Sequence, residues 1–167
     1  MNDSVSKDVD LLTGAWSKQR FESEFAQVCS SAQRAREELA LIRIDVDNMQ
    51  ELNDQHGRDR MDGCLAWLAE RISAMGDGRG PIGRLGGDDF AVYLRDCSLE
   101  DAVRLAERIR RAIPATLHAS AFGDFRVTVS VGVAVNKRGE PWGNLLDAAE
   151  QACIRAKQGG RDAVASR

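Results

Sequence analysis

The chain has 167 residues, 43% of them hydrophobic, with a formal charge of −3 from 23 basic and 26 acidic side chains. This length suits one domain with a substantial core, and the acidic balance argues against a general nucleic-acid binder. No apolar stretch approaches the length of a membrane span. We therefore expect one domain over residues 1–167, with 1–9 as a flexible tail, no membrane segment, no signal peptide and a cytoplasmic location.

Hydrophobic periodicity predicts alternating helices and strands. In chain order these are a helix over 18–38, a strand over 39–46, a short helix from 49, a helix over 61–74, a hairpin around Gly86 and Gly87, a helix over 98–113 closed by Pro114, a strand over 126–135 and a helix over 142–158. In the strand 126–135, valines alternate with small residues such as Gly132, and the small face lets a helix approach closely. One sheet covered by helices, an α+β fold, follows from this order.

The apolar run 39–46 predicts a buried central strand, and its end carries Asp45 and Asp47. Ligands bind beyond the carboxyl ends of strands in open sheets, so Asp45 is a candidate site residue. Asp47 is interpreted as the N-cap of the following helix.

The most informative stretch is RLGGDDF, residues 84–90. Gly86 and Gly87 predict a tight two-residue turn, because glycine reaches positive φ without steric cost. Asp88 and Asp89 next to this turn suggest a divalent cation and an anionic group held by it. A solvated acidic turn is the alternative, since such turns are common. The four cysteines form no C-x-x-C pair and the two histidines are isolated, so neither type predicts a metal or redox site.

Seven motifs together resemble the GGDEF domain, the catalytic domain of diguanylate cyclases, over nearly the whole chain. They are DLLTG at 10–14, IDVD at 44–47, ND with a following glycine at 53, 54 and 57, the aspartate at 62, RLGGDDF at 84–90, VTVSVGVA at 127–134 and RAKQGGR at 155–161. The resemblance implies an α+β fold with a central, mostly antiparallel sheet flanked by helices, related to nucleotide cyclase and polymerase palm domains.

The resemblance also implies a metal site. Asp45, the backbone carbonyl of Val46, Asp88 and Asp89 would hold Mg²⁺ or Mn²⁺, and Asp88 and Asp89 would be the catalytic carboxylates. Hard cations prefer such oxygen ligands and usually keep substrate phosphates among them, so this set suits a nucleoside triphosphate.

The expected substrate is GTP. By resemblance Asn53 and Asp62 would bind guanine, whose N1 and N2 donors a carboxylate accepts and adenine lacks. Lys157 and Arg161 would bind phosphates, although a solvated helix end is the alternative for these two cations. The remaining nucleotide contacts are expected from Gln50, Arg58, Gly86 and Gly87.

The implied reaction condenses two GTP molecules into cyclic di-GMP and releases pyrophosphate. Because one domain holds one GTP, two copies would meet across a twofold axis, and the active species would be a homodimer. A chain of this length carries no obvious dimerising sensor, so we expect that it is either an excised domain or depends on a regulatory or sensor partner for assembly.

Several positions depart from the family pattern. Gln50 replaces a lysine and loses a charge worth about 1 kcal/mol or more, which predicts a roughly tenfold slower reaction. Arg58 replaces a histidine and offers compensating charge, while Met61 replaces a glycine and is expected to crowd the base. Asp89 replaces a glutamate and is shorter by about 1.5 Å. A second function therefore stays open, a degenerate non-catalytic domain that binds GTP or a protein partner in signalling.

The family's inhibitory product site is an R-x-x-D motif shortly before the signature arginine. The matching positions hold Asp77 and Gly80, and Arg79 is out of register. We therefore expect no inhibitory product site. An altered purine preference is a further possibility, against which Asp62 argues.

Overall fold

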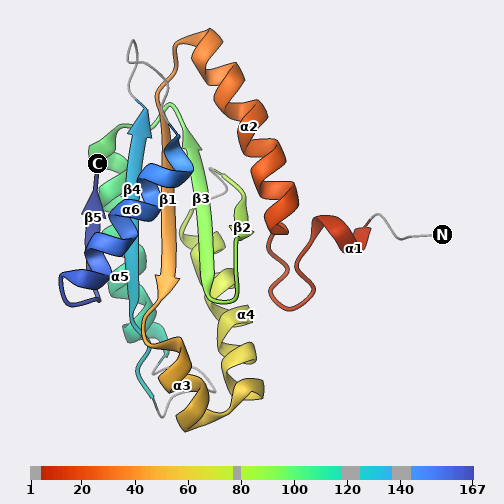
Figure 1. The fold of residues 1–167 in the computed structure, drawn as a ribbon, viewed down its shortest axis with the longest axis vertical. Coiled ribbons are helices and arrows are strands. Elements are labelled where there is room, and N and C mark those ends of the chain that lie inside the picture. Colours follow the sequence, from red (N-terminus) through yellow and green to blue (C-terminus); the bar gives the residue numbers. More distant parts are fainter. Residues whose placement is uncertain (1–4, 77–79, 118–124, 137–143) are drawn as a thin grey trace.

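A five-stranded sheet forms the centre of the protein (Figure 1). The computed structural model describes residues 5–76, 80–117, 125–136 and 144–167. The strand order is β2-β3-β1-β4-β5. The strands are β1 (Leu39–Val46), β2 (Ile82–Arg84), β3 (Asp89–Arg95), β4 (Val129–Asn136) and β5 (Val164–Ser166). All neighbouring pairs are antiparallel except β4 and β5, which run parallel. The predicted α+β fold with a mostly antiparallel sheet is confirmed.

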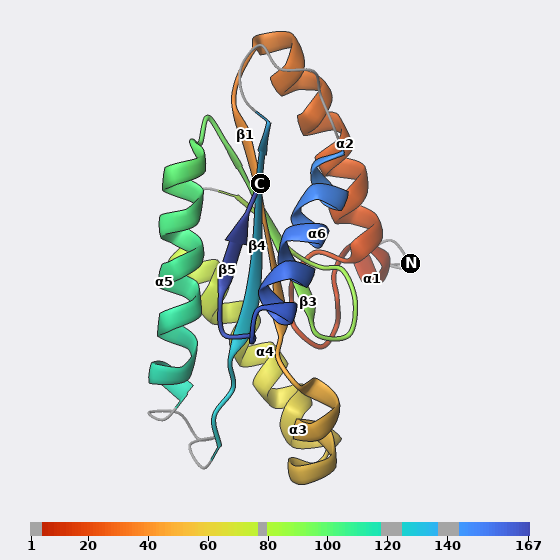
Figure 2. The same ribbon diagram turned by 60° about the vertical axis from the view of Figure 1, so that its left-hand side comes forward.

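Helices cover both faces of this sheet (Figure 2). One layer holds α4 (Arg58–Met75) and α5 (Leu99–Leu117), and the opposite layer holds α2 (Lys18–Ala35) and α6 (Leu145–Gln158). Alternate residues of β1 serve the two layers, as the period of a strand requires. Ile42 and Ile44 join the core under α4 and α5, whereas Leu39 and Leu41 join the core under α2.

Two shorter helices lie outside these layers. α3 (Met49–His56) begins just beyond the end of β1. α1 (Val5–Asp8) lies within residues 1–9, which were expected to be a flexible tail. Val9 then forms an isolated bridge with Trp16, so this segment contacts the rest of the domain.

Other differences concern element ends. Pro114 lies inside α5 rather than closing it, and the helix runs on to Leu117. A proline removes one helix hydrogen bond, but the preceding residue, Ile113, is fully buried, and its packing on the sheet holds this turn in place. The strand expected from 126 starts at Val129, and β5 was not predicted.

The predicted two-residue turn at Gly86 and Gly87 is wrong. β2 and β3 are joined by residues 85–88, and neither glycine has a φ in the left-handed region. The Leu85 amide closes the loop by donating to the Asp89 carbonyl at 2.7 Å. The Arg84 guanidinium donates to the Gly87 carbonyl at 2.6 and 3.1 Å, so a side chain stabilises a wider loop that needs no left-handed residue.

The small-residue face of β4 has the predicted role. A Cβ added to Gly132 would lie 2.1 Å from the Ala149 carbonyl oxygen and 2.4 Å from the Cys153 amide nitrogen, both in the backbone of α6. Helix α6 therefore rests directly on β4, and this close approach sets the position of the end of α6 beside the sheet.

We expect Gly132→Ala to lower the free energy of unfolding by about 3 kcal/mol, because the new methyl group meets helix backbone that has to move. Urea denaturation measures this loss. Gly87→Ala is the matched control: nothing lies within 4 Å of its added Cβ, so its stability should change by less than about 0.5 kcal/mol. Equal stability of the two variants would contradict the close packing of α6.

Candidate functional site

The carboxyl end of β1 meets the β2–β3 loop. Asp45 lies directly opposite Asp89 in the β1–β3 pairing. The Val46 amide donates to the Asp88 carbonyl at 3.1 Å, so the backbone of the acidic signature is bonded to the end of the central strand. The predicted neighbourhood of Asp45 and the signature carboxylates is therefore present.

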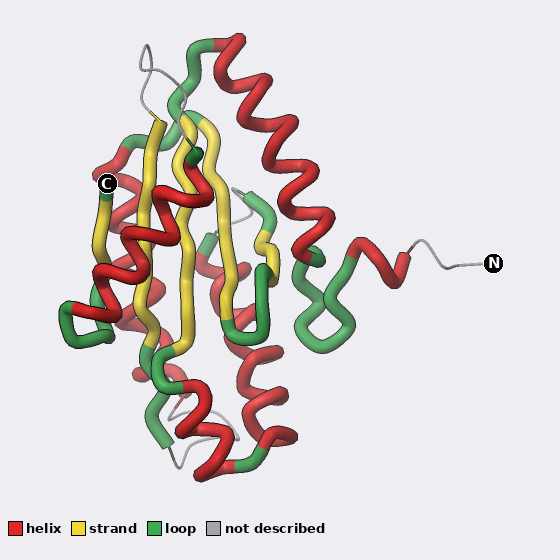
Figure 3. The backbone as a smooth tube through the Cα atoms, in the orientation of Figure 1, coloured by secondary structure: helices red, strands yellow, loops and turns green. Residues whose placement is uncertain are grey.

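A polar hollow of about 480 Å³ opens at this end of the sheet. It is lined by residues from the end of β1, from α3, from the β2–β3 loop and from the end of α6, segments that gather at one end of the domain (Figure 3). The lining residues are Val46, Asn48, Met49, Gln50, Glu51, Asp54, Asp88, Lys157 and Arg161. Acidic and basic groups thus face the same space.

Lys157 is the immediate partner of Asp45. Its ammonium group lies 2.5 Å from the Asp45 carboxylate. Burial raises the pKa of Asp45 to about 6, because Lys157 lowers it only in part and the charges of Asp88 and Asp89 raise it further. Burial alone would lower the pKa of Lys157, but the hydrogen bond and charge of Asp45 raise it above its usual value. The pair is therefore ionised near neutral pH, although burial of the charged Asp45 carboxylate is unfavourable for the folded state.

Asp89 has a different cation. The Arg43 guanidinium donates to both oxygens of Asp89, with distances from 2.6 to 3.1 Å, and also lies 3.3 Å from the Glu150 carboxylate. Burial raises the pKa of Asp89, and the bonds from Arg43 oppose that rise. Asp89 is thus engaged by β1 and is not among the residues that line the hollow.

The oxygen donors fit a magnesium-like ion. Asp88 and Val46 line the hollow, and Asp45 lies beside it through its bond to the lining residue Lys157. Among the described residues, no group of three or more histidine, cysteine, aspartate or glutamate side chains is arranged to hold a metal. Mg²⁺ is usually bound by one or two carboxylates together with water and substrate phosphates. The sparse set found here suits that mode rather than a closed protein cage.

The structure brings only some of the expected nucleotide contacts to the hollow. Gln50, Lys157 and Arg161 line it. The other expected contacts lie on neighbouring elements and do not line it: Asn53 on α3, Arg58 and Asp62 on α4, and Gly86 and Gly87 in the exposed hairpin loop.

Met61 does not crowd a base site as expected. Its side chain is fully buried and belongs to the core between the sheet and α4. The helical period explains this, since Met61 shares a face with Leu65 and Leu68, whereas Asp62 points to solvent.

Asp47 is the clearest miss of the sequence analysis. The N-cap of α3 is Asn48, and Asp47 is instead buried, with 2% exposure. Asn48 has a φ of 54° and lines the hollow. An asparagine between a strand and a helix is a usable signal for that conformation, because asparagine is enriched in the left-handed region. Glu51 and Asp54 also line the hollow and were not predicted.

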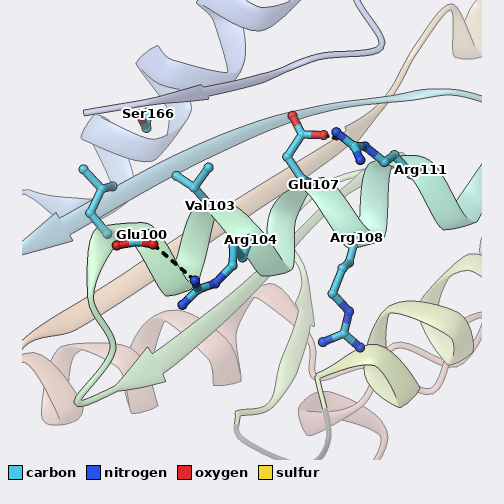
Figure 4. A pocket seen from close by; sticks show the side chains of 8 residues that line it. Glu100, Val103, Arg104, Glu107, Arg108, Arg111 and Ser166 are labelled. Carbon is cyan, nitrogen blue, oxygen red and sulfur yellow. Dashed lines mark hydrogen bonds and ion pairs between the residues drawn. The ribbon is translucent and has the colours of Figure 1, made fainter.

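A larger hollow, about 690 Å³, runs along α5 beside Ser166 of β5 (Figure 4). Its lining includes the apolar residues Leu99 and Val103 and three arginines of α5, of which Arg104 forms an ion pair with Glu100. It shares no residue with the acidic site. Its size does not make it the functional site, because its two carboxylates, Glu100 and Glu107, are already paired with arginines of the same helix. The expected absence of an inhibitory product site rests on Asp77, Arg79 and Gly80, and the first two of these lie outside the described residues.

The sheet and the acidic end of its central strand define an α+β domain with a polar site at that end. The family model described as "Diguanylate cyclase, GGDEF domain" matches residues 7–163, and the chain belongs to this family. No helix in the described ranges combines the length and apolarity needed to cross a bilayer.

Two relatives are similar to this chain over 93% of its length. The chain is 36% identical over 159 residues to the uncharacterized protein YhcK of Bacillus subtilis, covering 93% of this chain and 44% of that protein. It is 29% identical over 156 residues to a diguanylate cyclase of Vibrio cholerae, covering 93% and 48%. The chain therefore spans less than half the length of these two relatives.

Solved structures share the fold. The coiled coil and GGDEF domain of DgcB from Caulobacter crescentus, in complex with c-di-GMP, matches with a TM-score of 0.87 and 25% identity over 96% of this chain and 85% of that one. Diguanylate cyclase SiaD from Pseudomonas aeruginosa, in complex with its activator SiaC, matches with a TM-score of 0.87 and 27% identity over 98% and 64%.

We expect Asp45→Asn to be more stable than the parent at pH 8. Folding raises the pKa of Asp45 to about 6, so the folded state favours the protonated carboxyl. The resulting gain in stability is complete below the pKa of the unfolded chain and is lost as the pH rises through 6. Asparagine avoids that loss, which should amount to about 1 to 2 kcal/mol after allowance for the exposed part of the side chain.

Urea denaturation from pH 4 to pH 8 measures the effect, and the difference should vanish toward pH 4. Asp96→Asn, at an exposed position, is the control and should change the free energy of unfolding by less than about 0.5 kcal/mol. An Asp45→Asn variant that is less stable at pH 8 would mean that the Lys157 ion pair outweighs the burial of the charge.

Proposed function

We propose that this domain is a diguanylate cyclase that condenses two GTP molecules into cyclic di-GMP and releases pyrophosphate. The observation that carries the proposal is the polar hollow at the end of β1, where Asp88, Lys157 and Arg161 face one space beside Asp45. Membership of the GGDEF family supports the same chemistry.

Each side chain then has a physical task. Asp45, Asp88 and the Val46 carbonyl would hold Mg²⁺ or Mn²⁺, which when bound neutralises phosphate charge and acidifies the attacking hydroxyl. Asp88 would accept the proton of the 3′ hydroxyl, and Lys157 and Arg161 would bind the triphosphate. Asp89, as a further ligand or second catalytic carboxylate, would share its oxygens with Arg43. The ion pair with Asp45 would compete with the phosphates for the ammonium group of Lys157.

Base recognition is assigned to α3 and α4. Asn53 and Asp62 would bind the guanine edge, with Arg58, Gly86 and Gly87 as further contacts near the nucleotide. Asp62 is exposed at the start of α4 and Asn53 is half-buried on α3, so both are accessible to a base lying beyond the hollow. The carboxylate of Asp62 favours guanine over adenine.

The reaction needs two substrate sites. One hollow of about 480 Å³ accommodates one nucleotide, so we propose a homodimer that brings two such sites face to face. A regulatory partner is proposed as well, because SiaD is solved with its activator and the relative PleD is a response regulator. We propose the cytoplasm as the location, where GTP is available.

A second candidate is a non-catalytic domain that binds GTP or a protein partner. The observation that favours it is that Asp45 and Asp89 are both already paired with cations of the chain, and that Gln50 supplies no charge to the hollow. GTP binding without turnover, even in an enforced dimer, would favour this candidate over the cyclase.

We expect the purified protein at high concentration to form cyclic di-GMP from GTP with Mg²⁺ or Mn²⁺. Asp88→Ala should lower the rate by at least about 100-fold, because it removes a ligand and the proposed base. Chromatography of the products measures both. Glu70→Ala, which removes an exposed carboxylate from α4, should leave the rate unchanged. An Asp88→Ala variant as active as the parent would refute the assigned role of Asp88.

We expect Gln50→Lys to raise the rate about tenfold, because it adds a charge-assisted bond to the triphosphate. Gln55→Lys is the matched control, since Gln55 lies on the same helix but bonds to Glu51 and does not line the hollow. Initial rates of pyrophosphate release compare the two. An equal gain in both variants would indicate a general effect of positive charge instead of a contact at position 50.

A further inference from the structure

The buried carboxylate of Asp47 accepts three hydrogen bonds. The Ser130 hydroxyl donates to Oδ1 at 2.6 Å, and the Thr128 hydroxyl and the Asp162 backbone amide donate to Oδ2 at 2.7 and 3.0 Å. Only 2% of Asp47 is exposed, and it does not line the hollow. All three donors lie outside α3, so the side chain links the end of β1 to β4 and to the loop that follows α6.

That loop has an unusual backbone. Gly160, Arg161 and Asp162 have φ values of 121°, 65° and 44°. Two consecutive non-glycine residues in the left-handed region cost of the order of 1 to 2 kcal/mol each, so the loop needs contacts that hold it. On one side the Asp162 carboxylate is bonded by Arg110 at 2.8 Å and Arg126 at 3.2 Å. On the other side the Asp162 backbone amide donates a hydrogen bond to the Asp47 carboxylate.

We propose that Asp47 is a positioning residue that presents Arg161 to the polar hollow. Arg161 lines the hollow and directly precedes the residue whose amide Asp47 holds. Without this bond the strained turn relaxes, and the guanidinium loses its fixed place near the phosphates. The identity of the substrate in this inference rests on the proposed cyclase function, whereas the anchoring of the loop by Asp47 is independent of it.

Asparagine at position 47 is the conservative variant. A carboxylate accepts at both oxygens, and an amide accepts at only one. The amide oxygen can keep the bond from the Asp162 amide, and its NH₂ group can donate to the Ser130 hydroxyl, which then rotates to act as acceptor. Asp47→Asn therefore preserves the loop contact, whereas Asp47→Ala removes it.

The first test is a double-mutant cycle on the binding of a non-hydrolysable GTP analogue with Mg²⁺, measured by calorimetry. Asp47→Ala and Arg161→Ala should each weaken binding about tenfold, and the double variant should bind no more weakly than Arg161→Ala alone, because the two residues act through one contact. Asp47→Asn should stay within about threefold of the parent. Losses that multiply in the double variant would overturn the proposal.

A purely structural role would not give this pattern. Ile109→Val, a mild core variant on α5, controls for loss of stability and should leave affinity unchanged. If Asp47→Ala does not fold, Thr128→Val replaces it in the cycle, because it removes one of the bonds that orient the carboxylate. It should weaken binding less than Arg161→Ala and add nothing to it; an additive loss would again overturn the proposal.

The second test needs no nucleotide. Amide hydrogen exchange of Asp162, followed by NMR, should be slow in the parent and in Asp47→Asn and at least tenfold faster in Asp47→Ala. Equal exchange in all three proteins would refute the anchoring. A parent that shows this exchange pattern but does not bind the GTP analogue would refute the proposed function and leave the anchoring of the loop intact.

Discussion

The antiparallel pairing of β1 with both β3 and β4 is the constraint on which the rest of the structure depends. Its register places Asp45 opposite Asp89 on one side and opposite Ser130 on the other. A slip of one residue would turn every side chain of β1 to the other face of the sheet. Arg43 and Asp45 would then enter the core beneath α4 and α5, and the acidic site would be lost together with the packing.

The register also creates an electrostatic problem that the chain resolves locally. Like charges directly opposite each other on paired strands are destabilising, and Asp45 and Asp89 are such a pair. Arg43, two residues before Asp45, engages Asp89, while Lys157 from α6 engages Asp45. The close approach of α6 at Gly132 is what brings the lysine within reach. Packing of a helix against one glycine thus determines which cation balances the site.

Local pattern predicted the elements well and their long-range partners poorly. The apolar run 39–46 coincides with β1, and the small face of β4 correctly indicated a close helix. Asp47 was interpreted as a helix cap because that interpretation uses only its neighbours. Its actual partners lie 81, 83 and 115 residues further along the chain, where no periodicity links them to it. Strand β5 has only three residues, too few for an alternating pattern to stand out.

The difference between sequence patterns and long-range contacts also explains which parts of the candidate site could be predicted. The order of motifs indicated that Asp45, Asp88, Lys157 and Arg161 belong together, and three of these residues line one hollow, with Asp45 bonded to Lys157. No motif indicated that Asp89 would be held by Arg43, because that contact depends on which face of β1 carries the arginine. The side chains of the two signature aspartates, Asp88 and Asp89, therefore differ in how firmly they are held. Asp88 lies in a loop and faces the hollow, whereas Asp89 begins β3 and is held against the sheet. Two internal ion pairs, Arg43 with Asp89 and Lys157 with Asp45, therefore shape this end of the sheet as much as the carboxylates themselves.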